Sequence, residues 1–327
     1  MKSFVFFMLL LIAASAGAEK AYPSQDDCPA MPYINRNPGA EYADAVRLFQ
    51  GIPSIAAAPG GRLWVTWYGG GEGESSENYV LLATSGDDGR TWSKPKMVID
   101  PPFRASEPAL WLDPQKRLWF MWNLYPVRSS ALEQRKFKEQ FSNVDAYNTF
   151  MGRFNFIATQ LWVMMTENPD DENPVWSEPR LVAMETHNMN KPTVLADGTW
   201  LWPATPLPSS RPSLPRPLFS GDNGKTFRFR GEIPMGPKDI SASEYQVVQR
   251  KDGSLWCLNR TQYGIGESFS YDDGNTWTPM VPSKIIQTPS RFFITRLNSG
   301  KLLLVKHGPI DQNVGRAQLM AFLSDDD

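Results

Sequence analysis

The chain has only two histidines, and each lies among polar residues that separate apolar segments. His187 is in THNMNK (residues 186–191), and His307 is in KHGP (residues 306–309). An imidazole with a pKa near 6.5 can take up or release a proton at neutral pH. Both histidines are therefore candidates for acid-base catalysis, and for each the alternative is a hydrogen-bonded structural histidine.

A second set of polar side chains flanks short apolar runs that are typical of β-strands. These side chains are candidates to bind a substrate, and the arginines among them could hold an anionic group, because a guanidinium forms two parallel hydrogen bonds with a carboxylate. The candidates are Gln50, Tyr68, Arg104, Glu107, Asn190, Lys191, Glu244, Tyr245, Arg260 and Arg291. No cluster has the spacing of metal ligands, so we expect neither a metal nor another cofactor.

A repeated β-hairpin pattern is expected to position these side chains. A turn followed by an apolar strand recurs five times, and the matching leucines are 55, 83, 54 and 47 residues apart: Leu63, Leu118, Leu201, Leu255 and Leu302. Such periods are typical of the blades of a β-propeller, and a polar insertion at residues 128–156 accounts for the long step. In a propeller the ends of the innermost strands meet at a central channel. The polar residues at these ends are therefore expected to form one pocket.

Three segments between the hairpins share a second pattern, Ser-x-Asp-x-Gly-x-Thr followed by Trp or Phe. They are residues 85–92, 220–227 and 270–277, with a degenerate copy at residues 166–176. The Asp is expected to cap a tight turn, the Gly to adopt a positive φ, and the aromatic ring to pack under the next blade. We assign these segments a structural role and none in catalysis.

This motif is the Asp box, and through it the chain resembles the sialidase superfamily, in particular its secreted proteins with BNR repeats. The resemblance implies an all-β fold, a six-bladed β-propeller of the sialidase type. Five hairpins are present, and residues 324–327 (SDDD) look like the start of a further box. We therefore expect the C-terminal blade to be missing or incomplete in this chain. The alternative is a five-bladed propeller that ends on an acidic tail.

The resemblance also implies roles for individual residues. Glu244, in EYQVV (residues 244–248), looks like the sialidase glutamate that activates a tyrosine nucleophile, which would lie beyond residue 327. Arg260, which ends LNR (residues 258–260), and Arg316, in GRA (residues 315–317), look like two of the three arginines that hold the sugar carboxylate.

Two family features are altered in this chain. The Phe/Tyr-Arg-Ile-Pro motif, which supplies the first of these arginines, reads QGIP at residues 50–53. The acid Asp expected after the first hairpin is also missing, because residues 69–77 contain only Glu72, Glu74 and Glu77 as acidic residues. Gln50, Arg104 and Lys191 are candidates to replace the arginine, and a glutamate of this loop or a rim histidine is a candidate to replace the acid. We expect weak turnover of ordinary sialosides and a different preferred sugar.

The N-terminus has the features of a secretory signal. Lys2, an apolar run and Ala-Gly-Ala at residues 16–18 predict a signal peptide of residues 1–18, with a membrane anchor as the alternative. A lead-in segment (residues 19–46) and the propeller (residues 47–327) would follow, with no transmembrane segment after cleavage, so we expect a secreted or periplasmic protein. Cys28 and Cys257 are favoured as unpaired thiols, with a disulfide between them as the alternative. The net charge of −2 argues against a nucleic-acid partner.

Three functions fit these features, and all three imply a glycan or glycoconjugate as the partner. The first is an exo-acting glycoside hydrolase on a terminal acidic sugar, with sialic acid as the family default. The second is a polysaccharide lyase or another hydrolase on uronate-containing glycans, with His187 or His307 in the proton transfer. The third is a non-catalytic carbohydrate-binding propeller.

Overall fold

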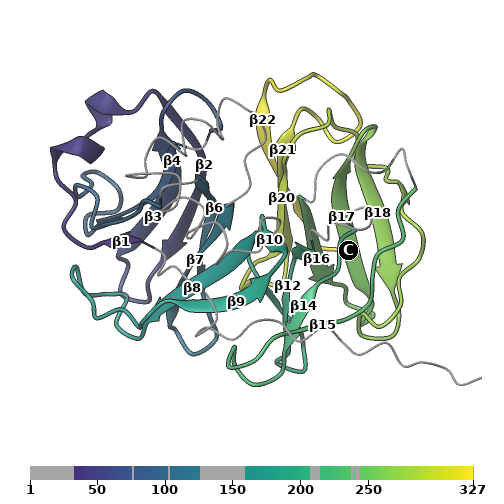
Figure 1. The fold of residues 1–327 in the computed structure, drawn as a ribbon. Helices are drawn as coiled ribbons and strands as arrows, with labels where there is room; N and C mark the ends of the chain where they lie inside the picture. Colours follow the sequence, from purple (N-terminus) through teal and green to yellow (C-terminus); the bar gives the residue numbers. More distant parts are fainter. Residues whose placement is uncertain are drawn as a thin grey trace, which may run out of the picture.

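The structure, a computed structural model, describes residues 33–75, 77–101, 104–125, 159–206, 214–236, 239 and 244–326. In this part of the chain the fold is all-β, apart from two short 3-10 helices, Ala40–Tyr42 and Asp44–Val46. The strands form five successive blades, which surround a common centre from purple to yellow in Figure 1. The all-β propeller predicted from the repeats is thus confirmed. The signal peptide, Cys28 and the insertion at residues 128–156 lie outside the described residues.

Each of the first two blades is an antiparallel sheet. Strands that follow one another in the chain lie side by side in it, from the centre outward. Blade 1 also gains an outermost strand from the lead-in segment. The strands of blade 1 are β2 (Phe49–Ala57), β3 (Leu63–Gly70), β4 (Asn78–Ser85), β5 (Met97–Ile99) and β1 (Ile34–Asn35). Those of blade 2 are β6 (Arg104–Leu112), β7 (Leu118–Tyr125), β8 (Gln160–Thr166) and β9 (Arg180–Met184).

The other three blades repeat this arrangement with shorter strands. The strands of blade 3 are β11 (Thr193–Val194), β12 (Trp200–Trp202), β14 (Leu218–Ser220) and β15 (Arg228–Phe229), with β10 (Thr186–Asn188) paired to β13 (Ala204–Pro206). Those of blade 4 are β16 (Tyr245–Gln249), β17 (Leu255–Thr261), β18 (Gly264–Ser270) and β19 (Val281–Pro282). Those of blade 5 are β20 (Phe293–Arg296), β21 (Leu302–His307) and β22 (Leu319–Ser324). Among the described residues no helix is long and apolar enough to cross a membrane.

Aromatic side chains fill the interfaces between neighbouring blades. Trp64 of blade 1 meets Trp176 of blade 2 edge to face, with ring centroids 5.8 Å apart. Trp119 of blade 2 meets Trp200 of blade 3 in the same way at 5.5 Å. All four rings are buried. Such pairs bury large apolar areas in a defined geometry, so they fix the angle between blades and hence the positions of the inner strand ends.

The Asp boxes form the predicted turns. In residues 220–227 the Ser220 hydroxyl donates to the Asp222 carboxylate at 2.8 Å and accepts from the Gly224 N–H at 2.9 Å. The Thr226 hydroxyl and amide also donate to Asp222, and these hydrogen bonds lower the pKa of its carboxyl to about 2. The boxes at residues 85–92 and 270–277 repeat these bonds, and the central glycine of each box has φ between +78° and +82°.

The aromatic residue of each box packs differently from the prediction. Trp277, in the box of blade 4, is buried against Leu201 and Phe219 of blade 3, which is the preceding blade rather than the next one. Trp92, in the box of blade 1, is 42% exposed. No blade precedes blade 1 in the described chain, so this ring lacks the neighbour that covers Trp277.

A methyl group at Gly224 is expected to destabilise the fold. A Cβ there would lie 2.4 Å from the Trp200 ring and 2.7 Å from the Trp119 ring, at a φ of +80° that disfavours alanine. We expect Gly224→Ala to lower the free energy of unfolding by about 2–4 kcal/mol, measured by urea denaturation. Gly221→Ala is the matched control, because it lies in the same box and its Cβ would meet no atom within 4 Å. Equal losses for the two variants would contradict this account.

Blades 1 and 5 leave apolar side chains uncovered where they face each other. Leu319 and Leu323 on β22 are 68% and 62% exposed, and Ile55 on β2 is 51% exposed. Blade 5 has three strands where blade 4 has four. The described chain thus forms five blades rather than the six of the predicted ring.

Candidate active site

The inner ends of all five blades surround a cavity of about 670 Å³. Nine of the candidates from the sequence line it together: Glu74, Arg104, Glu107, His187, Glu244, Arg260, Arg291, His307 and Arg316. The other lining residues are Ile52, Tyr125, Met189 and Ser290. Most of these side chains can carry charge or donate hydrogen bonds, so the cavity suits a polar ligand.

Three ion pairs cross this cavity. Arg260 bonds Glu244 at 2.9 Å, because the pairing of Tyr245 with Asn259 sets these two residues side by side at the end of the hairpin. Arg291 of blade 5 bonds Glu107 of blade 2 at 2.9 Å. The third pair, at 3.1 Å, joins Arg104 of blade 2 to Glu74 of the blade 1 loop. Each pair presents guanidinium donors and carboxylate acceptors to a bound molecule.

Arg316 differs from the other three arginines of the cavity. It is exposed on the loop after β21, and no salt bridge joins it to a carboxylate of the described residues. Four arginines against three glutamates leave the cavity lining with one excess positive charge at neutral pH. The arrangement can therefore accept one anionic group, and a carboxylate would match the planar fork of Arg316.

Bulges in the inner strands direct two of the lining residues into the cavity. The pairing of β6 with β7 shifts register between Ser106 and Ala109, and Glu107 between them has φ +50°. Ile52 of β2 has φ +48° at an equivalent shift. Both residues precede a proline, and such bulges re-aim side chains next to functional sites. A positive φ is strained in a non-glycine residue, so the surrounding fold holds these side chains in place.

Glu107 is the least exposed carboxylate of the three ion pairs. Its side chain is 7% exposed, against 53% for Glu74 and 11% for Glu244. Burial raises the pKa of Glu107, and the positive charges of Arg291 and Arg104 oppose this effect. The protonation of Glu107 thus depends on its arginine partners, because loss of one of them leaves burial uncompensated.

Tyr125 and His187 form a neutral pair in the same cavity. The Tyr125 hydroxyl lies 3.4 Å from His187 Nδ1, and reciprocal hydrogen bonds between Asn123 and Asn188 hold the two strands together beside them. Burial lowers the pKa of His187 to about 4 and raises the pKa of Tyr125. Among the described residues, His187 Nε2 has no hydrogen-bond partner. His187 is therefore an unprotonated base at neutral pH, next to a protonated phenol.

The buried state of His187 is expected to make the fold sensitive to acid. Its pKa is about 4 in the folded chain and 6.5 in the unfolded chain, so the unfolded state binds more protons between these values. Stability should be full above pH 6.5 and fall as the pH drops toward 4, by roughly 3 kcal/mol for this group. Thermal melts across this range should show a smaller loss for His187→Gln than for the wild type. Identical pH dependence would contradict the burial of a neutral imidazole.

A buried lysine supports the loop that carries His307 and Arg316. Lys306 is fully buried, and its ammonium donates to the backbone oxygens of His307, Gly308 and Pro309 at 2.6–2.8 Å. His307 Nδ1 in turn lies 3.3 Å from the backbone oxygen of Ala317. Because the Lys306 ammonium binds three backbone carbonyls at once, it holds the start of this loop in place.

The remaining predicted residues lie outside the lining of the cavity. Tyr245 is buried in the blade 4 core, where its hydroxyl donates to Ala204 O. Tyr68 is buried, and its hydroxyl donates to Glu74 at 2.7 Å. Gln50 is exposed and bonds Arg47 and Asp44.

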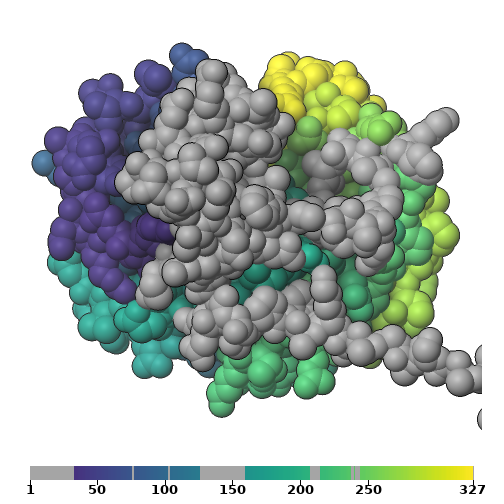
Figure 2. Space-filling view, viewed as in Figure 1, coloured from purple at the N-terminus to yellow at the C-terminus, as the bar shows by residue number. Residues whose placement is uncertain are grey.

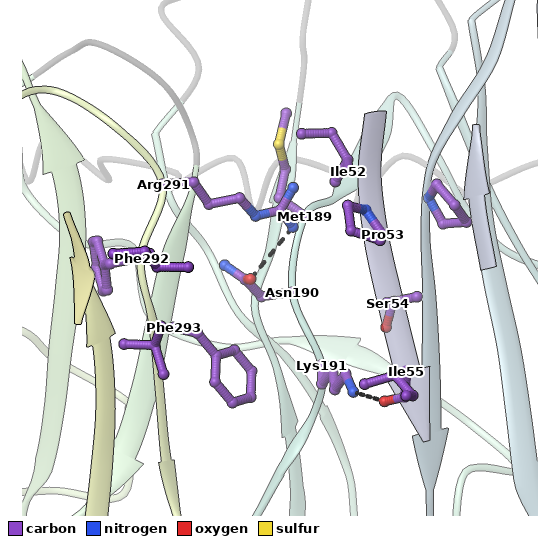
Figure 3. Close-up of a pocket in the computed structure, with 14 residues that line it drawn as sticks. Ile52, Pro53, Ser54, Ile55, Met189, Asn190, Lys191, Arg291, Phe292 and Phe293 are labelled. Atoms are coloured by element: carbon purple, nitrogen blue, oxygen red, sulfur yellow. Dashed lines mark hydrogen bonds between the residues drawn. The ribbon is translucent and has the colours of Figure 1, made fainter. Parts of the chain in front are cut away.

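Asn190 and Lys191 line a neighbouring pocket of about 380 Å³ (Figure 3). Asn190 accepts a hydrogen bond from Arg291 at 3.4 Å and donates to Tyr245 O at 2.8 Å. Lys191 donates to Ile55 O of blade 1 at 2.5 Å, and burial lowers the pKa of its ammonium to about 8. Arg291 and Met189 line both spaces, so this pocket adjoins the cavity.

Blade 1 has little room for the arginine that the QGIP segment lacks. A Cβ at Gly51 would lie 3.0 Å from the Phe49 ring and 3.6 Å from Tyr68. Instead, Arg291 and Arg104 supply the additional guanidinium groups of the cavity. Sequence reasoning missed Tyr125, Ser290, Ile52 and Met189. Tyr125 ends an apolar strand two residues after the polar Asn123, and this position was the only signal for it.

The chain matches the family of the BNR repeat-like domain over residues 155–327. No curated protein sequence matches it. A protein of unknown function from Dyadobacter fermentans is similar in structure, with a TM-score of 0.63, 15% identity, and coverage of 91% of this chain and 88% of that one.

Two solved sialidases have a similar fold. The Hadza microbial sialidase has a TM-score of 0.61 and 18% identity, over 86% of this chain and 57% of that chain. The intramolecular trans-sialidase of Ruminococcus gnavus, solved with oseltamivir carboxylate, has a TM-score of 0.56 and 17% identity, over 80% and 78%. The chain thus spans little more than half of the Hadza enzyme. At these identities the likeness establishes the fold alone. Because the family match covers more than half of the chain and agrees with its Asp-box propeller, the protein belongs to the family of the BNR repeat-like domain.

Proposed function

We propose that this protein is a glycoside hydrolase that releases a terminal acidic sugar from a glycan, with sialic acid as the family default. The observation that carries the proposal is the meeting of Arg260, Arg291 and Arg316 with Glu244 in one cavity. Three guanidinium groups can bind a sugar carboxylate by charge-assisted hydrogen bonds. A carboxylate beside them can accept a proton from the attacking group.

In this proposal each charged residue has a separate task. Arg316 binds the substrate carboxylate most directly, because it forms no ion pair with a glutamate among the described residues. Arg260 shares its charge between Glu244 and the substrate. Glu244 accepts the proton of the nucleophile as that group attacks the sugar carbon, and the tyrosine nucleophile of the sialidase resemblance would come from beyond residue 327.

We also propose that the complete protein is exported and closes a sixth blade. The signal-like residues 1–18 support a secreted or periplasmic location, with residues 19–46 as the lead-in and residues 47–327 as the propeller. The exposed Trp92, Leu319 and Ile55 support a further blade between blades 5 and 1. Removal of residues 1–18 during export, detected by mass spectrometry of the N-terminus, would test the first part.

The hydrolase proposal is tested by incubating the protein with a panel of glycans that end in sialic acid, a hexuronic acid or a neutral sugar. We expect release of an acidic monosaccharide, detected by chromatography and mass spectrometry. Sialosides should be poor substrates, because blade 1 lacks the family's first arginine. Release of neutral sugars alone, or no release from any acidic glycan, would contradict the proposal.

The Tyr125–His187 pair favours a second candidate, a lyase on uronate-containing glycans. His187 Nε2 would remove the proton from C5, beside the carboxylate held by the arginines. The electrons of the C5–H bond would form a C4=C5 double bond as the C4–O bond breaks, and Tyr125 would protonate the leaving oxygen. The His187 Nδ1 proton would then pass to Tyr125 across 3.4 Å, and exchange of the Nε2 proton with solvent would restore the starting tautomer.

An absorbance assay separates this candidate from the hydrolase. A C4=C5 double bond conjugated to the carboxylate absorbs in the ultraviolet, whereas hydrolysis creates no such bond. A rise in absorbance with polyuronates that is lost in both Tyr125→Phe and His187→Gln would favour the lyase. Release of saturated sugars by both variants would exclude this role for the pair.

A further inference from the structure

We propose that Glu107 is the proton donor to the leaving group, and that a substrate carboxylate bound at Arg291 keeps Glu107 protonated. The inference rests on the hydrolase proposal and adds to it the missing acid. The candidates from the sequence were the glutamates of residues 69–77 and the rim histidines, whereas Glu107 was expected only to bind substrate.

The surroundings of Glu107 make its charge conditional. Its carboxylate bonds Arg291 Nη1 at 2.9 Å, and Arg104 is the second cation near it. Glu74 adds a negative charge, and the buried Tyr68 and Tyr125 also interact with the charge of Glu107. The positive charges of Arg291 and Arg104 thus favour the ionised form of Glu107. The negative charge of Glu74 and the burial of the Glu107 side chain, which is 7% exposed, favour the protonated form.

A ligand carboxylate would change this balance at Arg291. The arginine lies at the boundary between the cavity and the adjoining pocket, where it also contacts Asn190 at 3.4 Å (Figure 3). A guanidinium bound by two carboxylates brings two negative charges together, and the repulsion between them favours protonation of one carboxylate. Glu107 is the better site for that proton, because it is buried and its charge depends on the shared arginine.

The other two glutamates of the cavity are less suited to donate a proton. Glu74 is about half exposed, pairs with Arg104 and accepts a hydrogen bond from Tyr68, so it lacks the burial of Glu107. Glu244 keeps its own partner Arg260, which is separate from Arg291. Of these glutamates, Glu107 has the least exposed side chain and bonds the arginine at which the ligand carboxylate is placed.

Bonds, electrons and protons balance in this reaction, and water is its only further reactant. Glu107 passes its proton to the glycosidic oxygen as the bond from that oxygen to the sugar carbon breaks, and the bonding electrons stay on the oxygen. The leaving group departs as an alcohol, and Glu107 becomes a carboxylate again. Water then attacks the sugar carbon as the bond from that carbon to the tyrosine oxygen breaks, and Glu244 returns its proton to the tyrosine. The proton lost by the water passes to the Glu107 carboxylate.

The test measures protons taken up on binding, with N-acetylneuraminic acid and glucuronic acid as probes. Titration calorimetry at neutral pH in two buffers of different ionisation enthalpy gives the number of protons bound with each ligand. We expect uptake of about one proton by the wild type. We expect none by Glu107→Gln. Glu267→Gln is the control, because Glu267 bonds Trp256 in blade 4 and does not line the cavity.

The possible results distinguish the role of Glu107 from the hydrolase proposal on which it rests. Binding without proton uptake by the wild type overturns the role of Glu107 alone. Equal uptake by Glu107→Gln overturns it as well. No binding of either acid overturns the proposed function and the inference together. The wild-type measurement remains decisive even if the variant does not fold.

Discussion

Replacing Arg316 by alanine is expected to weaken binding of an acidic sugar by about a hundredfold, whereas a neutral sugar should bind as before. Each charge-assisted hydrogen bond contributes roughly 1.5–3 kcal/mol, and the fork of Arg316 can form two. Arg316 is the cavity arginine without a glutamate partner among the described residues, so its loss leaves no buried carboxylate unpaired. Titration calorimetry with N-acetylneuraminic acid or glucuronic acid measures the change.

Two further variants sharpen this experiment. Arg316→Lys keeps the charge but loses the planar fork, so it should recover only part of the affinity. Arg228→Ala removes an exposed arginine from β15, away from the cavity, and should change nothing. If Arg316→Ala binds the acidic sugar as tightly as the wild type, residues other than Arg316 bind the carboxylate.

Replacing Glu244 by glutamine should reduce turnover by about 10²–10⁴-fold, the usual contribution of a general base. The same change should leave the affinity for an acidic sugar unchanged or higher. Glu244 now neutralises Arg260 at 2.9 Å, so its removal frees that guanidinium for the substrate. A lower kcat with an unchanged or lower KM is therefore the expected pattern, measured on whichever acidic glycoside the protein cleaves.

The matched control for this variant is Glu267→Gln, which removes a carboxylate from the same blade outside the cavity. It should retain wild-type kcat and KM. A Glu244→Gln variant that loses binding but keeps its turnover number would show that Glu244 positions the substrate and takes no part in proton transfer.

The repeats made most of the fold predictable. The spacing of leucines located the hairpins, and the Asp boxes located the turns, because both depend on local sequence. The repeats did not predict which neighbouring blade the aromatic ring of an Asp box contacts. The box of a blade packs on the preceding blade, as Trp277 does, and the repeat pattern contains no information on which neighbour a ring will meet.

The composition of the site could be predicted in part. Residues at the ends of inner strands, such as Glu244 and Arg260, follow from the hairpin pattern. Neighbours in a strand point to opposite faces, so Tyr245 enters the core although Glu244 faces the cavity. The pairing of Glu107 with Arg291 joins residues 184 positions apart, and only the arrangement of the blades around one cavity brings them together.

The central claim is that this cavity selects a sugar by its carboxylate. The most direct test compares the affinity of the protein for glucuronic acid and N-acetylneuraminic acid with its affinity for their methyl esters, which keep the hydroxyl groups but lack the charge. The account predicts that at least one acid binds more than about tenfold tighter than its ester, since one charge-assisted bond exceeds 1.4 kcal/mol. Equal affinity for acid and ester in both pairs would contradict it.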